Sequence, residues 1–395
     1  MRISTVGFQT DASQQMQALE AEISQTQHQL STGIKLQSAS DNPAGMAQVD
    51  LLDARISASQ QYQTNGSTLG ANLQIEEQSL TDATSVMQSA RDLALQANNS
   101  AITQTQRQDI STQLQQLLQQ LVGTANATDS NGNFLFSGET TTTQPFAQSG
   151  TAVTYNGSTS VSQVQISPNQ RVSSGDSGSS VFVNIPGGNG TFTTAVGAAN
   201  TGTATIGPGT VVNASQWVPD TYTITFQDPT DYTVTDSAGN TVASGTYTSP
   251  GTIAFNGISM TVTGTPAAGD TFAVAPAGTS SAFNTLSSLI TTLNDPSLSA
   301  AQISTQIGTA VEQIDGAVSN FNQVQASVGA RINAVTAANN SAQSVQTSMT
   351  ASVSSLQNVD YAAATTRLST EELALQAAQE SYASIAKMSL FQYLG

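Results

Sequence analysis

Apolar residues recur every three or four positions along roughly the first 150 residues, within polar segments that are rich in glutamine. This spacing places the apolar side chains on one face of a helix, because successive turns of an α-helix bring such positions together. Three stripes of this kind follow one another along the chain. They are Met16, Leu19, Ile23 and Leu30, then Leu69, Leu73, Leu80, Met87 and Ala94, then Ile110, Leu114, Leu117 and Leu121. The pattern predicts three amphipathic helices with narrow apolar seams.

From Ala147 to Pro276 the pattern changes to short runs, rich in threonine and valine, in which apolar and polar residues alternate. Alternation predicts strands with one buried face. The clearest runs are Val181, Val183 and Ile185, then Tyr222, Ile224 and Phe226, then Ile258, Met260 and Val262. Turns are expected at Asp228-Pro229 and at Ala238-Gly239-Asn240, where residues typical of turns separate the runs. This part of the chain is predicted to be an all-β region.

A heptad pattern begins at Val311, with core positions separated alternately by three and four residues. It continues through Ile314, Val318, Phe321, Gln325, Val328, Ile332, Val335, Asn339, Ala342, Gln346, Met349, Val353 and Leu356. Such a pattern predicts one long helix that packs as a coiled coil. The polar core residues Gln325, Asn339 and Gln346 either fix the register of the packing or are tolerated surface positions.

After a break from Asn358 to Tyr361, a last amphipathic helix is predicted, with Leu368, Leu375, Tyr382 and Ser389 on one row beside Ala378, Ile385 and Met388. Helices from both ends of the chain must then pair to bury their seams. The fold expected is multidomain α+β, with a long α-helical coiled-coil body formed by both termini and an inserted all-β domain. The expected domain ranges are 1–45, 46–146, 147–278, 279–357 and 358–395.

Charge and composition narrow the classes of partner. The chain of 395 residues has 26 acidic and 9 basic residues, a formal charge of −17, and no cysteine. Its charge has the wrong sign for phosphate backbones or anionic lipid, so we expect neither nucleic acid nor membrane as a partner. The N-terminus lacks the apolar core of a signal peptide. If the protein is secreted, we expect export without a cleaved signal.

Candidate chemistry is sparse. His28 is the one histidine, and its polar helical surroundings predict a solvated side chain. Residues Asp129 to Asn133 resemble the start of a calcium loop, but Phe134 stands where such a loop needs glycine and Thr140 where it needs glutamate. The run Gly187 to Gly190 opens no helix and is expected to be a flexible loop. We therefore predict no catalytic residue, cofactor or metal site, and no enzyme.

Two terminal motifs carry a family resemblance. Leu30-Ser31-Thr32-Gly33-Ile34-Lys35, followed by Ser38 to Gly45, is similar to the N-terminal signature of the bacterial flagellin family. In physical terms Gly33 can end the first helix, while Ser40-Asp41 with Pro43 can cap and begin the next. We therefore expect a family-signature turn that depends on Gly33, Asp41, Pro43 and Gly45.

Asn131 to Gly138, leading to Pro145-Phe146, resembles the hook-associated members of this family more than its filament subunits. The C-terminal half agrees with this resemblance at Val328 to Asn333, Asp360-Tyr361-Ala362, Leu375 to Ala378 and Ser389 to Leu394, of which the last is similar to the usual ending of those members. Gly264 to Phe272 resembles a segment of the β domains of flagellar axial proteins. The likeness covers residues 1–146 and 310–395 well and the middle of the β region little.

The resemblance implies a structural subunit of the bacterial flagellum at the junction of hook and filament. The implied partners are further copies in a tubular layer, the first hook-associated protein, flagellin and a flagellar export chaperone. The implied location is extracellular, after type III export. The residues expected to carry assembly are Leu19, Ile23, Leu30, Val353, Leu356, Leu368, Leu375, Tyr382 and Ile385. Two alternatives stay open: a flagellin filament subunit, and a secreted adhesin that presents the β region on a helical stalk.

Overall fold

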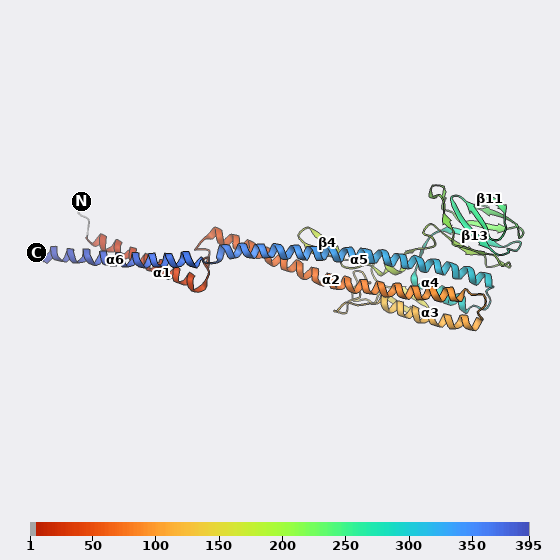
Figure 1. Cartoon of the computed structure of the whole chain (residues 1–395), viewed down its shortest axis with the longest axis horizontal. Helices are drawn as coiled ribbons and strands as arrows, with labels where there is room; N and C mark the ends of the chain where they lie inside the picture. Colours follow the sequence, from red (N-terminus) through yellow and green to blue (C-terminus); the bar gives the residue numbers. More distant parts are fainter. Residues whose placement is uncertain (1–4, 395) are drawn as a thin grey trace. The chain divides into compact units, whose positions relative to one another are not determined.

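The computed structural model describes the backbone of residues 5–394 and the side chains of residues 7–384. The chain divides into two compact units. The terminal unit consists of residues 1–63 and 340–395, and the central unit of residues 64–339. Figure 1 traces the elements of both in sequence colours.

Six α-helices account for the helical part of the described chain. They are α1 (Thr5–Thr32), α2 (Pro43–Ala97), α3 (Gln104–Ala125), α4 (Ala282–Asn294), α5 (Ala300–Gln357) and α6 (Tyr361–Leu394). α3 begins with a capping box, in which Thr103 and Gln106 each satisfy a backbone N–H of the other. The break between α5 and α6 falls where the sequence predicts it. The helical elements and the β region between them confirm the α+β fold expected from the sequence.

The seam between α2 and α5 is the core of the central unit. Its members on α2, from Leu69 to Ala94, are at most 3% exposed, and Ile314, Phe321, Val328 and Val335 are equally buried on α5. The two helices run antiparallel, since Thr81 of α2 lies by Gln325 of α5, and Arg91 of α2 by Asp315. Helices α3 and α4 contribute Leu114, Leu118, Leu286 and Leu289 to the same cluster. The second predicted stripe is confirmed as a core seam. The third is confirmed at Ile110, Leu114 and Leu121, whereas Leu117 is only partly buried and the neighbouring Leu118 lies in the core instead.

Five phenylalanines from distant parts of the sequence meet within this core. The ring centroid of Phe182 lies 5.2 to 5.8 Å from the ring centroids of four neighbouring phenylalanines. Those neighbours are Phe136, Phe146, Phe283 and Phe321. The segment from 146 to 186 thus packs into the helical core, with the hairpins β1 (Phe146–Ser149)/β2 (Ala152–Tyr155) and β3 (Gln163–Ser167)/β4 (Gln170–Ser173).

The predicted strand through Val181, Val183 and Ile185 is wrong for its first two residues. Residues Ser179–Val183 form a turn of π-helix, closed by the Asn184 N–H donating to the Ser179 carbonyl at 2.8 Å. The wider turn places adjacent Val181 and Phe182 in the core together, both 0% exposed, whereas a strand would separate them. Only Ile185 lies in a strand, β5 (Ile185–Pro186), which pairs with β15 (Thr279–Ser280).

The residues between β5 and β15 form two antiparallel sheets around a second core (Figure 1). One sheet has the order β11-β10-β9-β14-β6; the other has β12-β13-β7, with β8 also paired to β13. Their bounds are β6 (Phe192–Val196), β7 (Thr205–Ile206), β8 (Thr210–Val211), β9 (Tyr222–Phe226), β10 (Asp231–Thr235), β11 (Thr241–Thr246), β12 (Gly251–Phe255), β13 (Ile258–Thr263) and β14 (Thr271–Pro276).

The apolar faces of the two sheets supply this second core. The predicted runs of β9 and β13 are confirmed: all six apolar residues are at most 2% exposed. The predicted turns are also present, with Asp228 accepting from the N–H groups of Thr230 and Asp231, and Gly239 at φ 83°. The expected bounds of the β insertion, 147–278, stay a prediction. The buried residues of this range up to Ile185 belong to the helical core, and those from Phe192 to Val274 belong to the second core.

Candidate assembly surface

The signature turn connects α1 to α2 within the terminal unit. Gly33 ends α1 in the left-handed conformation, at φ 73°, and donates its N–H to the Gln29 carbonyl at 2.8 Å. The turn then pairs with the break between α5 and α6. The Lys35 N–H donates to the Gln357 carbonyl at 2.6 Å, and the Val359 N–H donates to the Gly33 carbonyl at 2.9 Å. These two hydrogen bonds join the α1–α2 turn to the break between α5 and α6.

The cap of α2 differs from the prediction. Asn42, not Ser40 or Asp41, is the N-cap: its Oδ1 accepts from the Gly45 N–H at 3.0 Å. Pro43 then occupies the first helical position, as expected. Asp41 instead stabilises the preceding turn, because its Oδ2 accepts from the N–H groups of Gln37 and Ser38 at 3.0 Å each. Hydrogen bonds from Ser38 and then Gln37 hold the pKa of Asp41 below its usual range.

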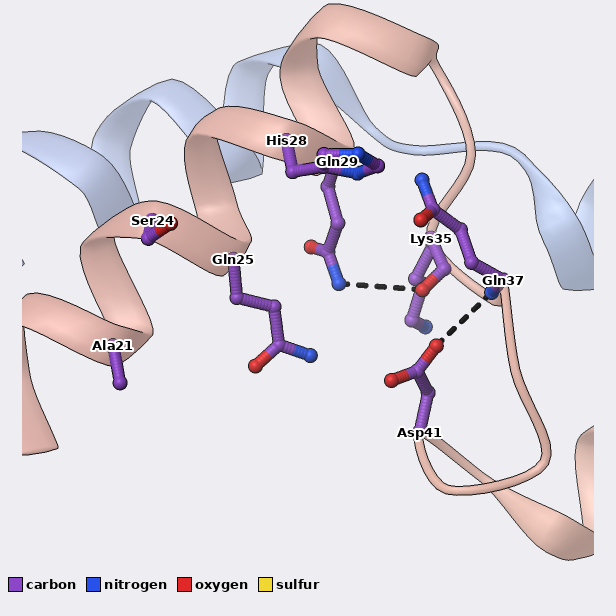
Figure 2. A pocket seen from close by; sticks show the side chains of 8 residues that line it. All are labelled: Ala21, Ser24, Gln25, His28, Gln29, Lys35, Gln37 and Asp41. Atoms are coloured by element: carbon purple, nitrogen blue, oxygen red, sulfur yellow. Dashed lines mark hydrogen bonds between the residues drawn. The ribbon is translucent and has the colours of Figure 1, made fainter.

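A polar hollow of about 390 Å³ lies between the end of α1 and this turn (Figure 2). One wall comes from α1, with Gln25, His28 and Gln29, and the other comes from the turn, with Lys35 and Asp41. Gln29 fixes the two walls by donating its Nε2 to the Lys35 carbonyl at 3.2 Å. His28 is exposed, as predicted. Most of the residues that line the hollow have polar side chains.

Helices α1 and α6 form an antiparallel pair (Figure 1). The direction follows from two contacts: Gly33 faces the Tyr361 hydroxyl, whereas Thr26 donates its Oγ1 to Glu371 Oε2 at 2.9 Å. On α1 the less exposed residues repeat in heptad spacing, as they do on α6. They are Ala12, Met16, Leu19, Ile23, Thr26 and Leu30 on α1, and Ala364, Leu368, Glu371, Leu375, Ala378 and Tyr382 on α6.

The residues expected to carry assembly lie on half-buried positions of this unit. Leu19, Ile23 and Leu30 lie on the α1 row, and Leu368, Leu375 and Tyr382 lie on the α6 row. Val353 and Leu356, near the end of α5, are half-buried as well. The side chain of Ile385 lies outside the described residues. The structure places these residues on heptad rows, and their role in assembly stays a prediction.

The sequence interpretation missed the polar pair of the seam. Thr26 is 2% exposed, the least exposed position of its row, and was passed over because it is polar. The signal was the spacing, since Thr26 lies three residues after Ile23 and four before Leu30. Glu371 follows Leu368 by three and precedes Leu375 by four in the same way. A heptad counted by position alone would have found both.

Exposed apolar side chains gather in the terminal unit. Nine large apolar residues are exposed among those whose side chains the structure describes. Six of them belong to this unit: Phe8, Ile34, Leu51, Val345, Tyr361 and Leu373. Leu373 is 67% exposed and lies between Glu371 and Leu375, so it faces away from the α1 seam.

No group of three or more metal-ligating side chains occurs within the described residues, and no helix in that part of the chain has the length and hydropathy to cross a membrane. The Asp129 turn is satisfied by protein alone, with Oδ1 accepting from Asn131 and Asn133. Burial raises the pKa of Asp129, but the hydrogen bonds from Asn133 and Asn131 outweigh it and leave the pKa below its usual range.

The terminal regions match known families. Residues 3–141 match the bacterial flagellin N-terminal helical region, and residues 311–394 match the bacterial flagellin C-terminal helical region. Residues 196–276, which hold most of the two-sheet core, match the D2-like domain of flagellar hook-associated protein 1. Flagellar hook-associated protein 3 of Salmonella typhimurium is 29% identical over 185 residues, 47% of this chain. The chain spans 58% of the length of that curated relative.

Solved structures extend the likeness over most of the chain. Flagellar hook-associated protein 3 of Legionella pneumophila is 31% identical with a TM-score of 0.74, over 78% of this chain and 98% of the other. A structure of the flagellar junction protein FlgL, also from Legionella pneumophila, is 32% identical with a TM-score of 0.68, over 73% of this chain and 99% of the other. The chain therefore belongs to the hook-associated protein 3 family of flagellin-like proteins.

Proposed function

We propose that the chain is a structural subunit of the bacterial flagellum that forms the junction between hook and filament. The observation that carries the proposal is the match to hook-associated protein 3 over nearly the full length of two solved relatives. The Asn131 to Gly138 motif, which distinguishes this branch in the sequence, contributes Phe136 to the core of the central unit, and Val328 to Asn333 contributes Val328. The proposed role is mechanical, and no catalytic step belongs to it.

The terminal unit is the proposed site of assembly. Its α1 and α6 rows are only half-buried within one chain, and Leu373 lies on the opposite face of α6. Completion of such seams by neighbouring copies would remove their apolar surface from water. The proposed partners are further copies in a tubular layer, the first hook-associated protein on the hook side, and flagellin on the filament side. The two-sheet domain would face solvent.

We further propose an extracellular location reached through the flagellar type III channel, with an export chaperone holding the C-terminal helical region beforehand. The acidic balance of 26 to 9 disfavours nucleic acid and anionic lipid as competing partners. The family relation supports this route.

The direct test is deletion of the gene in its motile bacterium, followed by electron microscopy and analysis of the culture medium. Hooks without filaments, with flagellin shed into the medium, would establish the junction role. Normal filaments would refute it and favour an adhesin, and a lack of filaments without shed flagellin would indicate a filament subunit.

A second test removes α6 alone, residues 361–395, in the complemented strain. We expect loss of junction assembly, while the two-sheet domain keeps its fold because its core takes no residue from α6. The fold is checked by near-ultraviolet circular dichroism of Trp217, which packs against Phe192 and Tyr222. Normal incorporation of the shortened chain would contradict the proposal.

A further inference from the structure

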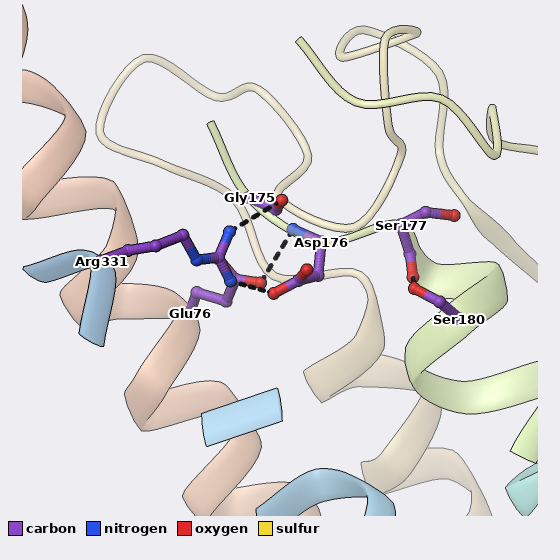
Figure 3. A network of polar contacts seen from close by, with 6 residues as sticks. All are labelled: Glu76, Gly175, Asp176, Ser177, Ser180 and Arg331. Atoms are coloured by element: carbon purple, nitrogen blue, oxygen red, sulfur yellow. Dashed lines mark hydrogen bonds and ion pairs between the residues drawn. The ribbon is translucent and has the colours of Figure 1, made fainter. Parts of the chain in front are cut away.

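A buried polar joint connects three parts of the central unit that are far apart in sequence (Figure 3). Glu76 comes from α2, Arg331 from α5, and Asp176 from the segment 174–178 that follows β4. The Asp176 N–H donates to Glu76 Oε1 at 3.0 Å. Arg331 donates from Nη1 to the Gly175 carbonyl at 3.0 Å and forms an ion pair through Nη2 with the Asp176 carboxylate.

The joint holds more acid than base. Two carboxyl groups share one guanidinium, and that guanidinium is committed to Asp176 and to a carbonyl. Glu76 is 1% exposed, so water cannot offset a second negative charge there. Burial, and next the charge of Asp176, raise the pKa of Glu76 well above its ordinary value, and Arg331 lowers it by less.

We propose that Glu76 keeps its proton in the folded chain, and that this protonated joint holds segment 174–178 against α2 and α5 and fixes the register between the two helices. The proton stays on Glu76, while Arg331 neutralises the negative charge of Asp176. Deprotonation leaves two carboxylates facing one another in a dry site and releases the segment. The proposal does not depend on the role at the hook.

The neighbouring titratable groups do not supply a substitute cation. On the loop before β1, Asp129 accepts from Asn72, one turn before Glu76 on α2. On β2, the Tyr155 hydroxyl contacts Ser177 Oγ at 3.3 Å. Glu77, next on α2, is half-buried and makes no side-chain hydrogen bond within the described residues. Arg331 is therefore the one cation of the joint.

Because of the joint, the stability of the central unit decreases as pH rises. The pKa of Glu76 is higher in the folded chain than in the unfolded chain, so its contribution is fully present below the ordinary glutamate pKa. As pH rises from there toward the folded pKa, that contribution is lost. The central unit should therefore weaken toward alkaline pH because of this one group.

The experiment compares full-length wild type with Glu76→Gln, Asp176→Asn and the control Glu77→Gln. Thermal unfolding is measured from pH 5 to pH 8, together with amide exchange at Asp176 corrected for intrinsic rates. Glutamine keeps the acceptor for the Asp176 N–H and adds a donor toward the carboxylate, so E76Q imitates the protonated joint. Between pH 5 and pH 8 the Tm of E76Q should rise relative to wild type by roughly 2 to 4 °C.

Two further results are expected. Glu77→Gln should follow wild type at every pH, and Asp176→Asn should move the loss of stability to lower pH because it removes the charge that raises the Glu76 pKa. Protection of the Asp176 amide should fall with pH in wild type and stay constant in E76Q. Parallel Tm curves for wild type and E76Q would overturn the proposal. If E76Q does not fold, pH-independent protection of the wild-type Asp176 amide would overturn it.

Discussion

Two antiparallel helix pairs in this chain carry the same heptad pattern but differ in burial. In the central unit, Leu73, Leu80 and Ile314 are 0% exposed on the α2 and α5 seam. In the terminal unit, only Thr26 and Ala364 are buried among the described heptad positions of α1 and α6. The difference arises because α3, α4 and the 146–186 segment cover the first seam. Nothing within the described chain covers the second in the same way.

The comparison teaches that a heptad predicts a seam without giving the number of partners that close it. Full burial of a leucine stabilises by about 1.5 to 3 kcal/mol. A half-buried leucine therefore leaves a gain on the order of 1 kcal/mol for association. Several such positions on α1 and α6 would favour assembly without making the isolated chain fold more tightly.

The difference in burial between the two seams is tested most strongly by replacing one leucine in each seam with alanine. Leu80→Ala should destabilise the isolated chain by roughly 2 to 5 kcal/mol, because it leaves a cavity in a closed core. Leu375→Ala, at a half-buried heptad position, should cost about 1 kcal/mol or less. Urea unfolding measures both. Equal losses would show that the terminal seam is as closed as the central one.

Glu312 shows what it costs to bury a carboxylate in the central unit. Both of its carboxylate oxygens are buried without a partner, and burial raises the pKa of Glu312 to about 7. Its stabilising contribution is thus present below the ordinary pKa and lost as pH rises from about 4.5 to about 7.

Glu312→Gln should therefore stabilise the chain at pH 8 by roughly 1 to 2 kcal/mol, a figure reduced because the side chain is only half-buried. At pH 4 the gain should vanish. Glu380→Gln on exposed α6 serves as the control and should show no such pH dependence in urea unfolding. A gain at pH 4 as large as at pH 8 would contradict the explanation by burial.

Gly33→Ala tests how far the turn between α1 and α2 stabilises the terminal unit. A side chain at φ 73° should destabilise that unit by about 1 kcal/mol, and its Cβ would lie 3.0 Å from the Tyr361 hydroxyl. Amide exchange at Val359, which donates to the Gly33 carbonyl, reports the loosening. Gly123→Ala in α3 is the control, since nothing lies within 4 Å of its added Cβ. Unchanged exchange at Val359 would exclude strain at Gly33.

The smallest effect on folding is expected at Leu373. Leu373→Glu should change the free energy of unfolding by no more than about 0.5 kcal/mol, because the side chain is largely in water. It should nevertheless reduce incorporation into flagella, scored by motility and by immunogold labelling. Val212→Glu, on an exposed side chain of the two-sheet domain, should leave incorporation normal. Equal incorporation of both variants would remove Leu373 from the assembly surface.

The sequence predicted what depends on local periodicity. The long helices, the seams through Leu80 and Phe321, and the alternating strands β9 and β13 all follow from spacing within a few turns or residues. The turn at Gly33 was also within reach, because glycine permits the left-handed conformation that ends a helix.

What the sequence did not predict depends on contacts across the chain. The turn of π-helix at Val181 has the alternating apolar and polar sequence of a strand. It is recognised only from the packing of Phe182 against Phe136 and Phe321. The cap at Asn42 could not be distinguished from Ser40 or Asp41, since all three residue types cap helices. The buried Glu76 was missed because its partner Asp176 lies 100 positions away. Thr26, in contrast, was within reach of the sequence, since its heptad spacing marks it as a seam position.

The antiparallel pairing of α1 with α6 also dictates an order of folding. Thr26 and Glu371 are separated by 345 positions, whereas neighbouring strands such as β9 and β10 are joined by a short turn. Contacts between distant positions form late, because the chain must first close a long loop at an entropic cost. The two-sheet domain can therefore fold on its own nearby contacts, while α1 waits for the last helix. We therefore expect α1 and α6 to be the last helices to pair, and their contacts to open before those of the two-sheet domain.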